Sequence, residues 1–365
     1  TTTPAAAAQA GHVVDLRSDT VTRPSARMKE VMVNCALGDD VYGQDPTVNY
    51  VEGVMAKFFG KEAAVYMPSG TQSNLCAMLT NCREKGESAL LGDKCHIYNY
   101  ERGGIAGVAG IFPQVVPNLA DGTFDLNVLQ KLIPPPTEHI AQPTVICLEN
   151  SQGGCSGAPV SLEFVKSVKK IAKKNKLRMH LDGARLLNAL VTQKISPEDY
   201  VEDFDTVSFC FSKGMGCPVG SVLVGTEADM WYARNMRKMV GGGMRQAGMT
   251  ASCALVALED WEDRLTADNE NALFLATELH EVEGLSCALL PQTNMFLFEM
   301  DSRITKGKKK LDHIGLSTRL REEYNILTFP TFQNDGIRVV THRDVNRRDM
   351  ETTRDAIRAV TSEYL

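Results

Sequence analysis

The chain has 365 residues, 43% of them hydrophobic, which is enough for two domains of ordinary size. Lys and Arg number 39 against 45 Asp and Glu, so the net charge of −6 argues against a protein whose main partner is nucleic acid. No stretch approaches 18 uninterrupted apolar residues, and we therefore expect neither a transmembrane helix nor a membrane partner.

The ten cysteines form no C-x-x-C pair, and several, such as Cys147 and Cys210, lie inside apolar, strand-like runs. Free cysteine commonly behaves as a small buried hydrophobe. The pattern favours a reducing compartment, the cytoplasm, with no disulfide framework and no zinc or other metal site.

The first ten residues, TTTPAAAAQA, are low in complexity and carry no charge, which fits neither a signal peptide nor a transit peptide. We predict a disordered tail over residues 1–12. The pattern of predicted helices and strands in the remaining sequence predicts a large domain over 13–250 and a small C-terminal α+β domain over 251–365.

Strand-like and helix-like patterns alternate in the predicted large domain. Asp45-Pro46 begins a helix with an apolar stripe at Val48, Val51, Met55, Phe58 and Phe59. Strands are predicted at 63–67, 89–91, 144–148, 177–181, 206–211 and 221–224, with helices between several of them, for example over 161–175. This alternation is typical of a mostly parallel sheet covered by helices.

The pattern changes after about residue 250. A long helical stretch is predicted through Trp261 and Leu279, followed by a strand at 295–299 and a helix at 311–323. A strand at 336–341 and a final helix from about Val345 complete the predicted smaller domain.

Polar features stand where strands end, and open α/β sheets bind their ligands at such places. Ser69-Gly70-Thr71 closes a strand and opens a helix, so its N–H groups and hydroxyls can bind an anion, although a simple helix cap would look the same. Asp182 ends another strand, and Arg185 follows one turn later. Together these two side chains could hold a ring nitrogen and a carboxylate.

Lys213 stands between Ser212 and Gly214, directly after the apolar strand that ends at Phe211. A partly buried lysine supplies the free amine that a covalent imine requires, although a lysine extended toward solvent is the alternative. The glycine-rich run 240–244 ends at Arg245 and could bring a guanidinium to a phosphate or act as an interdomain hinge.

The order of these features is more informative than any one of them. An anion-binding turn, a histidine, a strand-end aspartate and a strand-end lysine are the groups that pyridoxal 5'-phosphate (PLP) requires. The phosphate needs a helix N-terminus, the pyridine nitrogen a carboxylate, the ring a stacking face and the aldehyde a lysine.

The sequence closely resembles the low-specificity L-threonine aldolases, which are aspartate-aminotransferase-like PLP enzymes, over about residues 15–342. The resemblance implies the fold type I architecture, with a mostly parallel, seven-stranded type of sheet. The motifs that carry it are Leu16-Arg17-Ser18-Asp19-Thr20-Val21-Thr22, Gly38-Asp39-Asp40-Val41-Tyr42-Gly43, Asp45-Pro46-Thr47, Pro68-Ser69-Gly70-Thr71, His96-Ile97-Tyr98, Asp182-Gly183-Ala184-Arg185, Ser212-Lys213-Gly214 and Pro218-Val219-Gly220.

The resemblance also implies residue roles. The cofactor would be held by Lys213 as its covalent partner, Asp182 at the pyridine nitrogen, His96 on the ring, and Gly70, Thr71, Arg185 and Arg245. The amino-acid substrate would be held by Ser18, Tyr42, Arg185 and Arg338. Arg245 and Tyr42 would serve the neighbouring subunit, so that a homodimer or a tetramer of dimers shares its active sites.

One departure bears on the reaction. The family usually has Glu-Asn-Thr-His-Asn after the central strand, whereas this chain has Glu149-Asn150-Ser151-Gln152-Gly153. Gln152 can orient a substrate hydroxyl but cannot take its proton, which leaves His96, a water or a phosphate oxygen as the base. The predicted activity is cleavage of L-threonine, L-allo-threonine or related β-hydroxy-α-amino acids to glycine and an aldehyde. The alternatives are a PLP-dependent lyase or racemase acting on another amino acid and a non-catalytic descendant of the fold.

Overall fold

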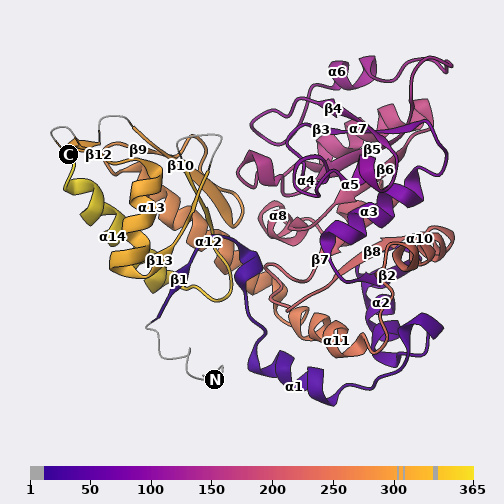
Figure 1. Ribbon diagram of the computed structural model, residues 1–365, viewed down its shortest axis with the longest axis horizontal. Helices are drawn as coiled ribbons and strands as arrows, with labels where there is room; N and C mark the ends of the chain where they lie inside the picture. Colours follow the sequence, from indigo (N-terminus) through magenta and orange to yellow (C-terminus); the bar gives the residue numbers. More distant parts are fainter. Residues whose placement is uncertain (1–11, 302–303, 307–308, 332–335) are drawn as a thin grey trace. The chain divides into compact units, whose positions relative to one another are not determined.

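The computed structural model describes residues 12–301, 304–306, 309–331 and 336–365. Two compact units divide the chain (Figure 1). The larger unit spans Thr22–Thr266, and the smaller unit combines the described residues up to Val21 with Ala267–Leu365. The tail predicted over 1–12 lies outside the described residues except for His12, whose Nε2 is 2.7 Å from Asp349 Oδ1 within the smaller unit.

A seven-stranded sheet forms the centre of the larger unit, in the order β2-β8-β7-β6-β5-β3-β4. Strands β4, β3, β5, β6 and β7 are parallel, and β8 runs antiparallel to both β7 and β2. The predicted mostly parallel sheet is confirmed. Its strands are β2 (Ala63–Met67), β3 (Glu87–Gly92), β4 (Phe112–Val116), β5 (Gln142–Glu149), β6 (Arg178–Asp182), β7 (Thr206–Cys210) and β8 (Ser221–Gly225).

Helices cover both faces of this sheet, so that neighbouring residues of one strand enter different hydrophobic cores. Leu90 of β3 packs with residues of α2, α7 and α8, whereas Leu91 packs with residues of α3 and α10. A sheet buried on both faces explains why its strands are continuous apolar runs. The helices are α1 (Ala26–Asn34), α2 (Pro46–Phe58), α3 (Gly70–Asn81), α4 (His96–Asn99), α5 (Gly104–Gly107), α6 (Leu126–Lys131), α7 (Leu162–Asn175), α8 (Leu186–Gln193), α9 (Pro197–Val201), α10 (Glu227–Met239) and α11 (Gly248–Ala257).

Helix α12 (Trp261–His280) contains the boundary between the units, so the boundary lies later in the chain than the predicted residue 250. The long helical stretch predicted through Trp261 and Leu279 is confirmed as α12, and a separate helix, α11, ends before it at Ala257. The predicted cap of α2 is confirmed, since Asp45 accepts hydrogen bonds from the N–H groups of Thr47 and Val48.

The smaller unit is built on an antiparallel sheet in the order β14-β15-β10-β9. Strand β1 (Val14–Asp15) pairs with β13 (Ile326–Leu327), which joins the N-terminal segment to this unit and not, as predicted, to the larger one. The remaining elements are β9 (Leu285–Ser286), β10 (Met295–Met300), β11 (Thr305–Lys306), β12 (Lys309–Lys310), α13 (His313–Tyr324), β14 (Phe329–Pro330), β15 (Gly336–Val340) and α14 (Arg347–Ser362).

All ten cysteines are free thiols, and nine of them are buried. Within the described residues, no helix has both the length and the apolar composition that a membrane crossing requires.

Candidate active site

The predicted site residues of the larger unit gather at one edge of its sheet. Strands β2, β3, β5, β6 and β7 run in the same direction, so their carboxyl ends share that edge. Thr71 follows β2, His96 follows β3, Gln152 follows β5, Asp182 ends β6 and Lys213 follows β7. The topology therefore brings together five residues that are far apart in the sequence.

Asp182 is buried, and both oxygens of its carboxyl group accept hydrogen bonds. Oδ1 accepts from the backbone N–H of Ala184 at 3.1 Å, and Oδ2 accepts from Asn74 Nδ2 at 2.8 Å. N–H donors stabilise the charged form of a carboxyl group. The surroundings of Asp182 therefore suit an anion that faces a protonated ring nitrogen.

His96 forms a hydrogen-bonded pair with Glu101, its Nδ1 lying 2.9 Å from Glu101 Oε1. Burial alone would lower the pKa of His96, but the bond to Glu101 and the charge of Asp182 outweigh it and raise the pKa. Burial also raises the pKa of Glu101, against the lowering effect of its bond to His96. One ligand atom from each of His96, Glu101 and Asp182 lies within 4.8 Å of the other two, so the three groups act electrostatically as one cluster.

Glu149, the last residue of β5, is a further acidic group that the sequence analysis assigned no role. One of its oxygens accepts from the backbone N–H of His96 at 2.7 Å and the other from that of Gly153 at 2.8 Å. Burial and the neighbouring Asp182 raise the pKa of Glu149 to about 7. A strand-end glutamate beside strand-end Asp182 was the signal that could have identified it.

Gln152 is buried beside Glu149, with its side-chain amide held on both sides. Its Oε1 accepts from the backbone N–H of Gly154 at 2.7 Å, and its Nε2 lies 3.5 Å from Glu149 Oε2. Gly122 fits closely against this side chain, because a Cβ there would lie 2.9 Å from Gln152 Cβ. Gln152 is thus a fixed polar group at the same edge as the cluster.

Lys213 is half-buried in a turn whose backbone is fastened from two directions. Its carbonyl oxygen accepts from Thr22 Oγ1 at 3.1 Å and from the N–H of Gly216 at 2.8 Å. Arg264 donates to the carbonyl of Gly214. Arg185 and Gly214 line one small pocket, which places Arg185 beside the turn that carries Lys213.

The predicted anion-binding turn is the N-terminus of α3. Ser69 caps the helix by accepting from the N–H of Gln72, so the N–H groups of Gly70 and Thr71 belong to the first turn, whose donors have no acceptor within the helix. A Cβ on Gly70 would lie 2.6 Å from Cys210 Sγ, so glycine is what lets this turn lie against the end of β7.

Arg245 and Tyr42 lie near each other on the exposed surface of the larger unit. Arg245 donates to Asp39 Oδ2 at 2.9 Å, and its backbone carbonyl accepts from the N–H of Asp40 at 3.0 Å. Tyr42 ends the short helical turn Asp40–Tyr42 and is 72% exposed. The role of both residues in a neighbouring subunit stays a prediction.

The smaller unit brings together Ser18 and Arg338. Arg338 lies in β15, donates to the backbone carbonyl of Arg17 at 3.0 Å and stacks 4.7 Å from the ring centre of Phe329. Ser18 Oγ accepts from the Thr20 N–H at 3.2 Å. Two residues separated by most of the chain therefore become neighbours, because β1 joins this unit.

Several solved structures share this architecture. The structure of Leishmania major threonine aldolase matches with a TM-score of 0.80 at 17% identity, over 95% of this chain and 99% of that one. The aspartate aminotransferase of Rhizobium meliloti matches with a TM-score of 0.68 at 13% identity, over 96% of this chain and 91% of that one. The protein therefore has the type I fold of PLP-dependent enzymes.

Sequence comparison narrows this class to a family. The profile of the beta-eliminating lyases matches residues 15–302. The chain is 39% identical to low-specificity L-threonine aldolase 1 of Arabidopsis thaliana, over 93% of this chain and 94% of that protein. It is 38% identical to the low specificity L-threonine aldolase of Escherichia coli (strain K12), over 93% of this chain and 96% of that protein. The chain belongs to the beta-eliminating lyase family, among the low-specificity L-threonine aldolases, and it is a lyase that depends on PLP.

Proposed function

We propose that this protein cleaves L-threonine, L-allo-threonine and related β-hydroxy-α-amino acids to glycine and an aldehyde, with PLP bound at the sheet edge described above. The observation that carries the proposal is that Asp182, His96 and Lys213 lie at the carboxyl ends of three strands along one edge of the sheet. Its relatives named as threonine aldolases support the choice of substrate class.

The residues at this edge fit the cofactor. The first turn of α3 supplies backbone N–H groups for a phosphate, and Gly70 allows this turn to pack against the end of β7. Asp182 is a buried carboxylate with its geometry fixed, and Lys213 is a half-buried amine on an anchored turn. When bound, PLP supplies the electron sink that stabilises the carbanion left on the substrate's Cα.

The chain's own residues would then position the substrate and move its proton. Arg185 is suited to hold the substrate carboxylate. His96 has Nδ1 fixed by Glu101, so Nε2 is the nitrogen that can accept the proton of the β-hydroxyl. Gln152 would orient that hydroxyl, since its amide cannot act as a base.

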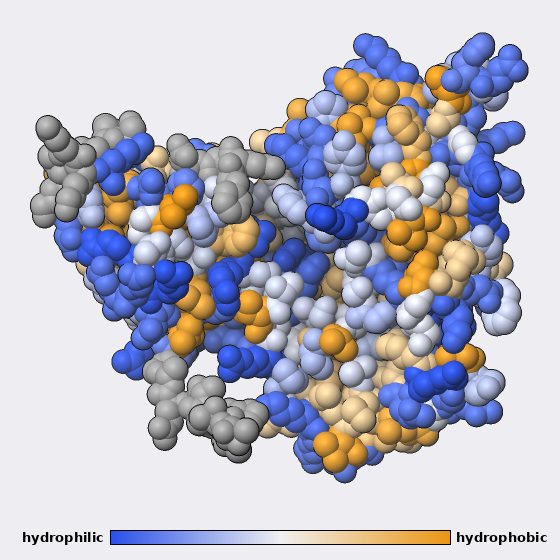
Figure 2. Space-filling view, viewed as in Figure 1, coloured by the Kyte–Doolittle hydropathy of each residue, from blue (hydrophilic) through white to orange (hydrophobic). Residues whose placement is uncertain are grey.

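We propose further that the protein forms a homodimer, or a tetramer built from such dimers, and that two subunits contribute residues to each active site. Arg245 and Tyr42 are exposed together on the larger unit, and both would reach the site of the neighbouring subunit. Apolar side chains also gather in patches on the surface of this unit (Figure 2). An oligomer would bury such patches.

A panel of amino acids tests the proposed function. The purified protein, reconstituted with PLP, is assayed for glycine and aldehyde release from threonine, allo-threonine and serine-like substrates, with Lys213→Ala as the negative control. We expect equal amounts of glycine and aldehyde from the β-hydroxy amino acids. Racemisation or elimination in place of these products would point to another PLP reaction, and a protein that takes up no PLP would be a non-catalytic descendant.

A further inference from the structure

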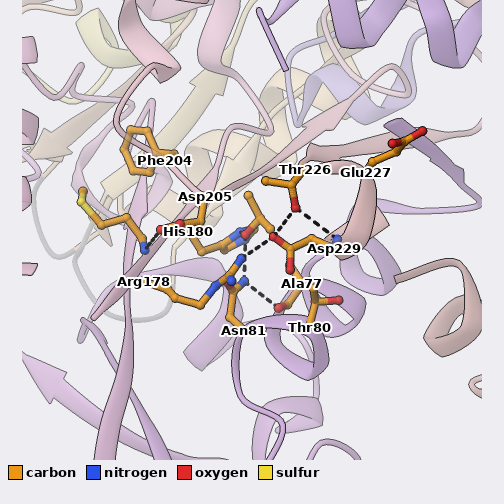
Figure 3. A network of polar contacts seen from close by, with 12 residues as sticks. Ala77, Thr80, Asn81, Arg178, His180, Phe204, Asp205, Thr226, Glu227 and Asp229 are labelled. Atoms are coloured by element: carbon orange, nitrogen blue, oxygen red, sulfur yellow. Dashed lines mark hydrogen bonds and ion pairs between the residues drawn. The ribbon is translucent and has the colours of Figure 1, made fainter. Parts of the chain in front are cut away.

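A chain of hydrogen-bonded polar side chains, all buried except the last, leads from Asp182 through the interior of the larger unit, and Figure 3 shows its far half. Successive partners lie 2.8, 3.3, 2.9, 2.8 and 2.6 Å apart, counted from Asp182. The members in order are Asp182, Asn74, His180, Thr206, Asn81 and Arg178. None of them was singled out by the sequence except Asp182.

The hydrogen positions near Asp182 follow from counting donors. Asn74 has two N–H groups on Nδ2, and they are used by Asp182 Oδ2 and Glu101 Oε1, both at 2.8 Å. The opposite amide orientation would place a carbonyl oxygen against two carboxyl groups. Asn74 Oδ1 is therefore an acceptor, and His180 must carry its hydrogen on Nε2 to donate to it.

The hydrogen positions in the far half of this hydrogen-bonded series follow from the same reasoning. Asn81 Nδ2 donates to the Ala77 carbonyl at 2.7 Å and to Thr206 Oγ1, while its Oδ1 accepts from Arg178 Nε. Burial lowers the pKa of His180 to about 4, so the ring is neutral and its Nδ1 is an acceptor. The hydroxyl hydrogen of Thr206 therefore points to His180 Nδ1.

Every hydrogen in the chain thus points toward Asp182. This hydrogen-bonded series starts at a cation, the guanidinium of Arg178. Arg178 also donates to Asp229 Oδ2 at 2.6 Å, and Arg83 donates to the other oxygen of Asp229 at 2.9 Å. The series ends at the anion of Asp182. Hydrogen bonds aligned in one direction between opposite charges polarise one another and strengthen the last bond.

We propose that His180, Thr206 and Asn81 are positioning residues, which hold the Asn74 amide with its N–H groups on Asp182 and so keep this carboxylate oriented for the pyridine nitrogen. The inference rests on the proposed PLP site and extends it to three residues that touch neither cofactor nor substrate. Because the arrangement exists in the protein alone, it can be tested without any amino-acid substrate.

The first test measures which nitrogen of His180 carries the hydrogen. ¹⁵N NMR of cofactor-free protein labelled at histidine distinguishes protonated from unprotonated ring nitrogens, and a His180→Gln variant assigns the resonances. We expect a neutral ring with hydrogen on Nε2 and none on Nδ1 at neutral pH. Hydrogen on Nδ1, or on both nitrogens, would overturn the proposal even if the protein proves to be an active aldolase.

The second test breaks the chain at Thr206 with a matched pair of variants. Thr206→Val keeps the branched shape in buried β7 but leaves His180 Nδ1 without a donor, whereas Thr206→Ser keeps the hydroxyl. We expect Thr206→Val to weaken PLP affinity and lower kcat by roughly tenfold, while Thr206→Ser stays within about threefold of wild type. The KM for threonine should change little in either variant.

Equal losses in both variants, or no loss in Thr206→Val, would contradict a positioning role for this hydroxyl. PLP affinity is read by absorbance titration, which does not depend on which amino acid the enzyme cleaves. Should Thr206→Val fail to fold, the wild-type NMR measurement still decides the direction in which these hydrogen bonds point.

Discussion

In the larger unit, Asp182 is buried with an N–H donor on each oxygen, whereas in the smaller unit Arg338 is half-buried and contacts a backbone carbonyl and an aromatic ring. The first environment fixes one charged group in one orientation. In the second, a long side chain lies near the surface. The carbonyl that it contacts belongs to Arg17, which the short pairing of β1 with β13 holds in this unit. We therefore expect substitutions of Lys213 and Asp182 to act on cofactor chemistry, and substitution of Arg338 to act on substrate binding.

Replacing the lysine of the larger unit should have the greatest effect. Lys213→Ala should abolish turnover while the fold survives, because the variant lacks the only amine on the anchored turn between Phe211 and Gly216. Turnover and far-UV circular dichroism check the two expectations. Lys170→Ala, at an exposed position of α7, is the control and should keep wild-type activity. Full activity of Lys213→Ala without added amine would contradict the assignment.

Asp182→Asn should retain PLP but lose about 10² to 10⁴ in kcat, because an amide cannot stabilise a pyridinium as a carboxylate does. Asn74 would also face an amide in place of an anion. Steady-state kinetics at measured PLP occupancy checks the loss, and Asp182→Glu tests whether charge alone suffices. A decrease in kcat of less than about tenfold would mean that Asp182 does not pair with the ring nitrogen.

In the smaller unit, Arg338→Ala should raise KM for the amino acid by roughly ten- to a hundredfold, with PLP affinity unchanged. A guanidinium–carboxylate contact contributes about 1.5–3 kcal/mol, which corresponds to that range. Arg338→Lys keeps the positive charge but lacks the planar guanidinium, so its KM should lie between those of the wild type and Arg338→Ala. If KM stays the same in Arg338→Ala, the residue serves only the packing against Phe329.

Gln152→His is expected to have the smallest effect and the opposite sign. A neutral histidine can take a proton at Nε2 when its ring hydrogen is on Nδ1, and in that tautomer it gives up the Gly154 N–H that Gln152 Oε1 now accepts. We expect kcat/KM for threonine to increase, by up to about 10². The comparison is made across pH with PLP occupancy measured in both proteins. An unchanged rate and pH profile would show that Gln152 only positions the hydroxyl.

The central sheet and the positions of its polar strand ends could be predicted from the sequence, because strands buried on both faces are apolar runs. Strand β4 was missed because Pro113 and Gln114 interrupt its pattern, and β4 lies at the edge of the sheet. The N-terminal segment was assigned to the larger unit because its partner strand, β13, lies some three hundred residues away, which no local pattern reveals.

The gathering of polar side chains that end or follow strands could likewise be predicted, but their hydrogen-bond partners could not. Asn74 lies in the middle of α3 and Glu101 in a loop, and they matter only because the fold brings both to Asp182 and His96. The chain through His180 and Thr206 is equally non-local. Sequence reasoning finds the groups that do chemistry more readily than the groups that hold them.

The most direct test of the account is to locate PLP on the chain. The protein is reconstituted with PLP, reduced with borohydride, digested and mapped by mass spectrometry. We predict that the pyridoxyl group is found on Lys213 and that Lys213→Ala carries none. A pyridoxyl group on another lysine, or none on the wild-type protein, would contradict the assignment of the cofactor site.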